Sequence, residues 1–467
     1  MATNHASALE GWTSRWTFVL AATGSAIGLG NIWRFPFIAG ENGGGAFVLL
    51  YLVCLALIGV PLLVAELMLG RRTRHNPVRA MQYLVKESGS SRQWVWLGRF
   101  SVLAGFMILS FYAVVGGMAL AYIFHAAFGD FAGAAPADIV RLFTRLQADT
   151  DGLVVWHSLF LLLVVVVSMR GLRRGIERSI RVIMPLMLVL ILALLAYAWR
   201  FGAFETSAHF MLDFAPEQLG WDALLDAMTH AFYTVSVGMG AMMIYGAYMP
   251  PHASMRVSVL SIAAIDTLVG IAAGLIIYAL VFAQGLDARS GFSLMFHTLP
   301  LALGHLPFGQ FFGSLFFVLV ALAAWSSALA LLEPGVAWFQ EATGWSRAAA
   351  TWIVALGAWL LGLGTVFSFN TWQSATLLGQ TFFSWINFIS SGLLVPVVGL
   401  MLGIFCVWVL SAQASAETLR FPKPVWHQVW RRVTGTVAVV SVLVILVMGV
   451  HGYAVGMCGG NPGLPWC

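Results

Sequence analysis

The chain has 467 residues, of which 60% are hydrophobic and only 9% are charged. A soluble protein of this length would form two or three domains, with ~25% charged residues to cover their surfaces. The composition excludes that class and also a disordered chain, and it predicts an all-α polytopic membrane protein. The net charge of +5 does not indicate a nucleic-acid binder, because the basic residues lie in short loops between apolar runs.

Eleven apolar runs reach the ~20 residues that a membrane-spanning helix needs. Runs of this length are too long for barrel strands, and in lipid the backbone must satisfy its own hydrogen bonds, so each run is expected to be a helix. Together they form a single transmembrane domain over residues 1–467. The expected spans are 13–40, 44–70, 97–127, 153–170, 177–200, 222–249, 257–285, 308–340, 346–367, 376–411 and 433–454.

The loops carry an uneven distribution of Lys and Arg. Basic residues gather in segments 71–99, 170–181 and 420–432, whereas the loops of the other side mix arginines with acidic residues. The positive-inside rule then predicts a cytoplasmic N-terminus and a C-terminus outside. Cys458 and Cys467 would lie in an oxidising space, either as a disulfide or as two free thiols.

Two spans contain sequences that argue against a continuous helix. The first has GSAIGLGN at 24–31 and the sixth has YTVSVGMG at 233–240. Glycine inside a helix costs ~1 kcal/mol relative to alanine and tolerates unwound backbone, although helix-packing faces are also rich in glycine. The pairing of the first and sixth spans favours unwinding, because broken helices at matching places in an inverted repeat mark a midplane binding site. The repeats would be 12–200 and 222–411, with 433–454 as an extra helix.

The stretch from Trp12 to Gly45, with GSAIGLGNIWRFPFIAGENGGGAF, resembles the first helix of the neurotransmitter:sodium symporters. The resemblance continues in PLLVAELMLGR at 61–71, GIERSIRVIMP at 175–185, and WSSALALLEP at 325–334. It covers nearly the whole chain and implies the LeuT fold of five plus five helices, with helices 1 and 6 broken and an eleventh helix added. Similar bacterial members of this family transport amino acids with sodium, so the resemblance implies an integral protein of the bacterial inner (plasma) membrane.

The resemblance implies two sodium sites built from oxygen ligands. The first would use the carbonyl of Ala26 with Asn31, Thr234 and Asp266, completed by the carboxylate of the substrate. Many members have asparagine in place of Asp266 and need chloride or a nearby glutamate, so Asp266 is expected to make transport independent of chloride; the alternative is an Asp at a cytoplasmic helix end. The second site would combine carbonyl groups with two hydroxyl groups, from Gly24, Ile27, Ala323, Ser326 and Ser327.

The expected substrate is a neutral, hydrophobic or aromatic L-amino acid. Amine-transporting members have aspartate at the position of Gly28, and glycine leaves room for a substrate that brings its own carboxylate. By resemblance the carboxylate meets Tyr112 and the amides of Leu29 and Gly30, and the ammonium meets backbone carbonyls. The full set of expected binding residues is Ala26, Leu29, Gly30, Ile108, Tyr112, Tyr233, Thr234, Ser236, Met239, Ser327 and Leu331.

The resemblance also implies gating and supporting residues. Glu66 would brace the unwound sixth helix, or alternatively exchange a proton. Gly175 and Pro185 would let the fifth helix unwind, or form an ordinary proline kink. The basic N-terminal partner of Glu341 is replaced by Leu9, and the acidic partner of Arg34 is replaced by a neutral residue. The expected gating residues are Trp12, Arg34, His230, Tyr233, Glu341 and Asn387.

Three other functions are alternatives to sodium symport. A proton-coupled amino-acid carrier on the same fold is the second candidate. An intramembrane enzyme would need a partner for Ser326 or Ser327, and the sequence shows no such motif, so an enzyme is not expected. A channel would conduct without saturation. The expected partners are an amino acid, two sodium ions and membrane lipid, and a monomer is one possibility for the oligomeric state.

Overall fold

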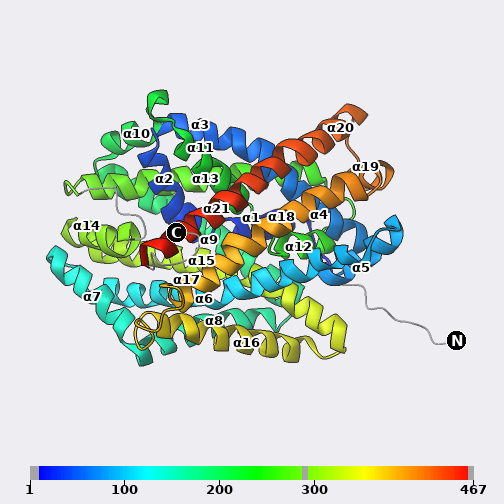
Figure 1. Ribbon diagram of the computed structural model, residues 1–467. Helices are drawn as coiled ribbons and strands as arrows, with labels where there is room; N and C mark the ends of the chain where they lie inside the picture. Colours follow the sequence, from blue (N-terminus) through cyan, green and yellow to red (C-terminus); the bar gives the residue numbers. More distant parts are fainter. Residues whose placement is uncertain (1–9, 287–292, 461–467) are drawn as a thin grey trace.

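The computed structural model describes residues 10–286 and 293–460. Figure 1 shows helices running side by side between two ends of the molecule. The part of the chain in these ranges forms no strand, and its only β features are two isolated bridges. The α-helices are α1 (Arg15–Ala26), α2 (Phe35–Glu41), α3 (Gly45–Cys54), α4 (Val60–Thr73), α5 (Pro77–Ser88), α6 (Val95–Phe128), α7 (Pro136–Ala148), α8 (Thr150–Ser168), α9 (Arg178–Phe201), α10 (Phe204–Leu212), α11 (Trp221–Tyr233), α12 (Ala241–Tyr248), α13 (Met255–Phe282), α14 (Leu299–His305), α15 (Gly309–Thr343), α16 (Arg347–Ser368), α17 (Phe382–Asn387), α18 (Val395–Ile404), α19 (Ala412–Leu419), α20 (Pro424–Val433) and α21 (Val439–Gly460).

Within the described ranges, nine helices are long and apolar enough to cross a membrane. Several of these spanning helices consist of two consecutive α-helices joined by a short π-helical segment. They match nine of the eleven predicted runs. They are Gly45–Thr73, Arg92–Phe128, Thr150–Ser168, Leu172–Phe201, Met255–Phe282, Gly309–Thr343, Arg347–Ser368, Phe382–Val409 and Pro424–Met457.

The two remaining runs are interrupted where the glycine-rich sequences lie. α1 ends at Ala26, and the chain is bent at Ile27 and Gly28 before helix resumes toward α2. Between α11 and α12 the residues Ser236, Gly238 and Gly240 have positive φ angles of 53°, 87° and 75°. This left-handed backbone is easy for glycine and uncommon for serine, so the GMG sequence permits the break. The predicted breaks at 24–31 and 233–240 are therefore present.

α4 packs closely on α12, so it lies beside the break between α11 and α12. A Cβ at Gly70 would overlap the carbonyl oxygen of Met243, and a Cβ at Gly246 would overlap that of Leu67. Glycine at both contact points lets the two backbones touch, as in other membrane helix pairs. The result places Glu66, in the middle of α4, beside the unwound segment.

Polar surface helices were not predicted, and some ends differ. α5, α7 and α10 contain both polar and apolar residues, and they are too short or too polar to be identified as membrane-spanning helices. The last spanning helix begins at Pro424 rather than at 433, because α20 is amphipathic and carries Arg431 and Arg432 within its helix. The tenth begins at Phe382 rather than at 376.

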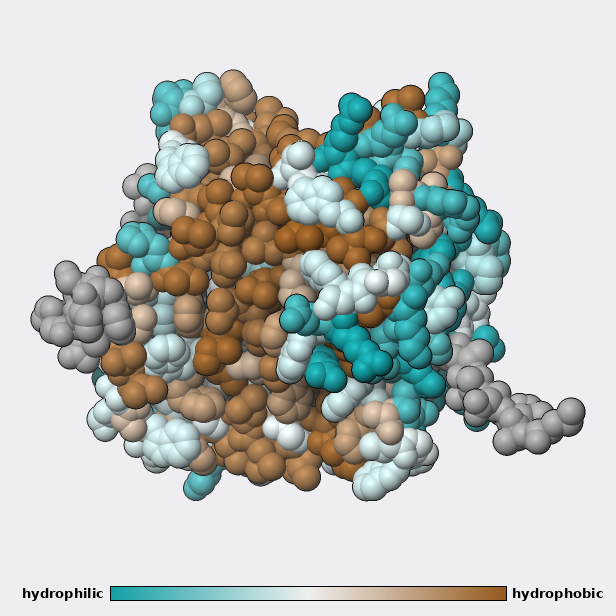
Figure 2. Space-filling model, turned by 45° about the vertical axis from the view of Figure 1, so that its right-hand side comes forward, coloured by the Kyte–Doolittle hydropathy of each residue, from teal (hydrophilic) through white to brown (hydrophobic). Residues whose placement is uncertain are grey.

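The surface separates into an apolar belt and a polar end. Figure 2 shows a broad hydrophobic band with hydrophilic residues gathered on the side where α5 and α20 lie in Figure 1. We call this side the arginine-rich end, defined by arginines of segments 71–74, 170–181 and 420–432. α20 and α21 run from it toward the opposite end (Figure 1). The choice between a disulfide and two free thiols at Cys458 and Cys467 falls outside what the structure describes.

Candidate sodium and substrate site

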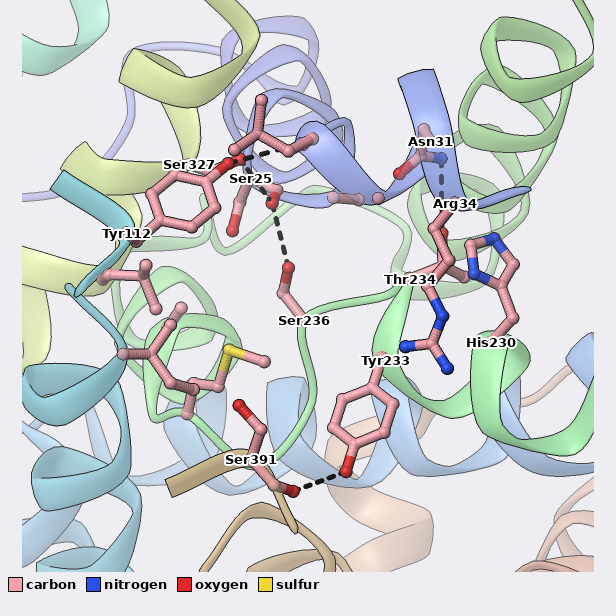
Figure 3. A pocket seen from close by; sticks show the side chains of 18 of the residues that line it. Ser25, Asn31, Arg34, Tyr112, His230, Tyr233, Thr234, Ser236, Ser327 and Ser391 are labelled. Carbon is pink, nitrogen blue, oxygen red and sulfur yellow. Dashed lines mark hydrogen bonds between the residues drawn. The ribbon is translucent and has the colours of Figure 1, made fainter. Parts of the chain in front are cut away.

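A cavity of about 440 Å³ lies where the two broken helices face each other, between α6, α15 and the chain near Ser391. All eleven residues expected to bind substrate line it, and Figure 3 shows Tyr112, Tyr233 and Ser236 around one space. Arg34, His230 and Asn387, expected at a gate, line it as well. The cavity also touches residues that the sequence reasoning did not select: Ser25, Thr229, Ala241, Ser391 and Gly392.

The bend after α1 presents polar groups to the cavity. The amide of Leu29 donates to the hydroxyl of Tyr112 at 3.4 Å. A Cβ at Gly28 would lie 3.1 Å from the Ser327 hydroxyl and 3.2 Å from that of Tyr112, so glycine keeps the space between these groups open. A Cβ at Gly30 would have no neighbouring atom within 4 Å, so the space beside this residue is open. Two hydroxyls and freed amides around open space suit a carboxylate.

A set of neutral oxygen atoms surrounds the end of α1. The Ser326 hydroxyl donates to the carbonyls of Gly24 (2.7 Å) and Ala323 (3.0 Å). The Ser327 hydroxyl lies 3.3 Å from the Ile27 carbonyl. The structure thus brings together all five residues expected at the second sodium site. Oxygen ligands of this kind suit a hard cation.

A second set of oxygen atoms contains a buried carboxylate. The amide nitrogen of Asn31 donates to Oδ1 of Asp266 at 2.7 Å, and the hydroxyl of Thr234 donates to Oδ2 at 2.6 Å. Asp266 has no exposed surface and lies in the middle of α13, which excludes the alternative of a helix-end Asp. Ala26, whose backbone carbonyl is the remaining expected ligand, lines the cavity together with Asn31 and Thr234. These are the four residues expected at the first sodium site.

Ser25 connects the two broken helices, although no sequence motif marks it for this role. Its carbonyl accepts a hydrogen bond from the Ser236 hydroxyl at 2.9 Å and lies 3.3 Å from the Ser327 hydroxyl. Figure 3 shows Ser236 reaching from the unwound sixth helix toward Ser25. A backbone carbonyl can play this part for any residue type, which is why the sequence could not reveal it.

Glu66 satisfies backbone groups that the second break leaves free. Its carboxylate accepts from the amide of Gly238 at 2.8 Å and from that of Met243 at 3.2 Å. Its side chain is buried. An unpaired carboxylate in a membrane interior is costly, and these two hydrogen bonds offset part of that cost. The geometry favours the bracing role over a proton-exchange role.

Few polar contacts close the cavity toward the end opposite the arginines. The Tyr233 hydroxyl donates to the carbonyl of Ser391 at 2.5 Å. Arg34 and Asn387 both line the cavity, yet no hydrogen bond joins them, and within the described ranges Arg34 has no ion pair within 4 Å. His230 is buried and stacks on Phe35 with ring centroids 5.2 Å apart.

The closure at the arginine-rich end is much thicker. Trp12 is buried, packs edge-on against Tyr245 at 5.4 Å, and donates its backbone N–H to the Tyr248 carbonyl at 2.9 Å. Beneath it, Glu333 is fully buried and accepts from the Tyr248 hydroxyl at 2.6 Å. Arg347 pairs with both oxygens of Glu333, at 2.9 and 2.5 Å.

Comparison with known proteins identifies the molecule's relatives. The profile of the sodium:neurotransmitter symporter family matches residues 9–133 and 140–455. The chain belongs to this family. An uncharacterized sodium-dependent transporter of Bacillus subtilis, YhdH, is 34% identical over 399 residues, which cover 84% of this chain and 86% of the relative. A mouse sodium- and chloride-dependent neutral and basic amino acid transporter, B(0+), is 25% identical over 69% of this chain.

A solved structure shares the whole architecture. The crystal structure of MhsT in complex with L-phenylalanine has a TM-score of 0.84 and 34% sequence identity, over 94% of this chain and 99% of that chain. The chain is therefore an integral membrane protein with the LeuT fold and a sodium-dependent transporter of the symporter family. Members of this family are secondary transporters and not enzymes.

Two expectations from the family pattern meet a different arrangement here. Glu341 accepts from the amide of Asn76 at 3.3 Å and pairs with Arg79 at 3.3 Å, so α5 supplies its basic partner. Leu9, which replaces the basic partner usual in the family, lies outside the described residues. The segment from Gly175 to Pro185 is helical in this state, and a Cβ at Gly175 would overlap the Val167 carbonyl.

Proposed function

We propose that the protein imports a neutral, hydrophobic or aromatic L-amino acid together with two sodium ions, without a need for chloride. The observation that carries the proposal is the cavity at the two helix breaks, whose lining contains no Asp or Glu. A substrate amine would meet only carbonyl groups there, whereas a substrate carboxylate would meet Tyr112, freed amides and a sodium ion. This favours an amino acid over a decarboxylated amine.

The far side of the cavity supports an apolar side chain. Ile108, Met239 and Leu331 line it, and methionine adapts its shape to different ligands. MhsT was crystallised with L-phenylalanine, and a bovine relative that is 37% identical over 111 residues is named as a sodium-dependent neutral amino acid transporter, B(0)AT2. Both relatives agree with the chemistry of this lining.

The charge balance supports independence from chloride. Two sodium ions and a zwitterion would bring net positive charge into a low-dielectric interior, which is costly without an anion. Asp266 supplies a carboxylate at the first site. One helical turn further on, a Cβ at Gly270 would lie 2.9 Å from the ring of Phe35, so an acidic side chain has no room there.

We further propose how the protein is oriented in the membrane and where its two inverted repeats lie. The arginine-rich end faces the cytoplasm of a bacterial cell by the positive-inside rule, with the N-terminus inside and the C-terminus outside. Segments 12–200 and 222–411 form the inverted repeats, and the breaks after Ala26 and after Tyr233 support this division. The Trp12 closure then faces inward, so the structure represents a state shut to the cytoplasm.

Uptake into proteoliposomes tests the function. A panel of amino acids and amines is offered with and without a sodium gradient, and then with gluconate in place of chloride. The proposal expects saturable, sodium-dependent uptake of leucine, tryptophan or tyrosine that gluconate leaves unchanged. Asp266→Asn should lose most uptake and recover part of it with added chloride. Wild-type uptake that stops without chloride would overturn the charge-balance argument.

The second sodium site has its own test. Ser326→Ala with Ser327→Ala removes both hydroxyl ligands, so the sodium concentration for half-maximal uptake should rise at least tenfold. The control pair is Ser261→Ala with Ser314→Ala, whose hydroxyls bond only to carbonyls of their own helices. Equal sodium dependence in both double variants would remove the assignment.

A further inference from the structure

A hollow of about 740 Å³ at the arginine-rich end has no part in the transport site. It lies between the residues before α1 and the start of the Leu172–Phe201 helix, and it is lined by Thr13, Glu177 and five arginines. We call it the arginine cleft. All five arginines are exposed to solvent: Arg170, Arg173, Arg174, Arg178 and Arg181.

The carboxylates of the cleft do not balance its arginines. Glu177 is 2% exposed, accepts a hydrogen bond from the amide of Thr13 at 3.2 Å, and pairs with Arg181 at 2.5 Å. Glu10 accepts from the backbone amide of Arg173 at 3.4 Å. Two carboxylates thus face five guanidinium groups. The sequence before Glu10 contains no Asp or Glu that could add a third.

Three of the arginines have no side-chain partner among the described residues. Arg170, Arg174 and Arg178 form no side-chain hydrogen bond or ion pair there, whereas Arg173 donates to the Gly11 carbonyl at 3.1 Å. Helix stability does not explain the positions of Arg174 and Arg178, because cations at a helix start oppose the helix dipole. Like charges lining one hollow repel each other, so a bound anion would stabilise the arrangement.

We propose that the arginine cleft binds a phosphate-bearing anion, supplied by the headgroup of an anionic phospholipid. Guanidinium groups pair with phosphate through two parallel hydrogen bonds. The cleft lies at the end of a spanning helix whose exposed apolar residues Val182, Val189 and Leu192 face away from the protein core, so lipid headgroups are the nearest source of phosphate. Basic clusters next to a spanning helix attract anionic lipid in this way.

The bound anion would also strengthen the closed state. Arg181 donates to the hydroxyl of Thr13, and Glu177 accepts from the same hydroxyl, so the start of the helix holds the residue next to Trp12. A phosphate on Arg174 and Arg178 leaves these bonds intact and removes the repulsion that opposes them. Effects on uptake would rest on the proposed function, whereas binding of the anion does not.

Lipid binding to the full-length protein in neutral detergent tests the proposal. Fluorescent phosphatidylglycerol is titrated against the protein, with fluorescent phosphatidylcholine as the neutral lipid and glycerol 3-phosphate as a competitor. Wild type should bind phosphatidylglycerol more tightly than phosphatidylcholine. At ~1 kcal/mol for each arginine, Arg174→Gln with Arg178→Gln should weaken phosphatidylglycerol binding by about 30-fold.

The control variant also removes two positive charges, but from positions of the arginine-rich end outside the cleft. Lys86→Gln with Arg92→Gln changes two exposed residues outside the cleft and should keep wild-type binding. Without anionic lipid, the Arg174/Arg178 variant should unfold at the wild-type temperature or above it, because it loses only repulsion. Equal lipid affinity in both double variants, or no preference for phosphatidylglycerol, would overturn the proposal. Full competition by glycerol 3-phosphate would keep the phosphate site and assign it to a soluble anion.

Discussion

The two ends of the cavity are closed by different kinds of contact. At the arginine-rich end, Trp12 is buried against tyrosines, and the fully buried Glu333 is paired with Arg347. At the opposite end the closing polar contact is the hydrogen bond from Tyr233 to the Ser391 carbonyl, and Arg34 has no hydrogen bond to Asn387.

This difference indicates which side opens more easily. Breaking a buried ion pair leaves a charge without compensation and costs ~3–5 kcal/mol, whereas a single neutral hydrogen bond contributes ~0.5–1.5 kcal/mol. The state described here therefore holds its arginine-rich end shut firmly and its opposite end lightly. Substrate and sodium can reach the cavity from the opposite end at little cost, and passage the other way needs the buried pair to separate.

Glu333→Gln should have the largest effect on this difference. The variant keeps an acceptor for the Tyr248 hydroxyl but leaves Arg347 without its carboxylate, at a cost of ~3 kcal/mol. We expect a clear fall in thermal stability and, because the closed population falls, weaker substrate binding. The measurements are thermal unfolding and substrate titration on the same purified protein.

Glu341→Gln is the matched control for Glu333→Gln. It removes a carboxylate at the same end, but the partner side chain of Arg79 is 51% exposed, and such pairs contribute ~0–1 kcal/mol. The control should lie close to wild type in both measurements. If the two variants behaved alike, the buried pair would not be what holds this end shut.

Tyr233→Phe should have a smaller effect, at the other closure. Removing the hydroxyl deletes one hydrogen bond and keeps the ring, so substrate affinity should fall by up to about tenfold, or ~1 kcal/mol. Thermal stability should change little, because the Ser391 carbonyl lines the cavity, where water can replace the lost hydroxyl. A loss as large as that of Glu333→Gln would contradict the light closure.

The sequence predicted more of the site than of the surroundings that hold it. Glycine and hydroxyl residues in mid-membrane marked both breaks, and a buried acid such as Asp266 is rare enough in a span to stand out. Ser25 and Ser391 act through their backbone carbonyls, so their side chains gave no signal.

The pairing at the arginine-rich end was missed for another reason. Glu333 lies in WSSALALLEP at 325–334, a motif that carries the family resemblance, but nothing in the sequence marks Arg347 as its partner. Their contact joins residues on α15 and α16 across a helix–helix turn, which spacing alone does not fix. The partner of Glu341 likewise came from α5, a polar helix that hydropathy does not detect.

Asn387→Asp should produce the smallest change, and it should strengthen the light closure. Arg34 is half-buried on the cavity wall, and Asn387 is exposed on the same wall, so an aspartate there would face an arginine without an ion pair in the described chain. An exposed pair of this kind contributes ~0.2–1 kcal/mol, which corresponds to substrate release slowed by up to about fivefold. Salt screens such a pair, so the slowing should fade when ionic strength is raised at constant sodium with N-methylglucamine gluconate. Substrate dissociation rates at low and high ionic strength measure both effects, and Asn387→Ser is the control because it lacks the charge. A slower release that high salt leaves unchanged would show that the aspartate acts by some route other than Arg34, and the contrast between the two closures would then need another explanation.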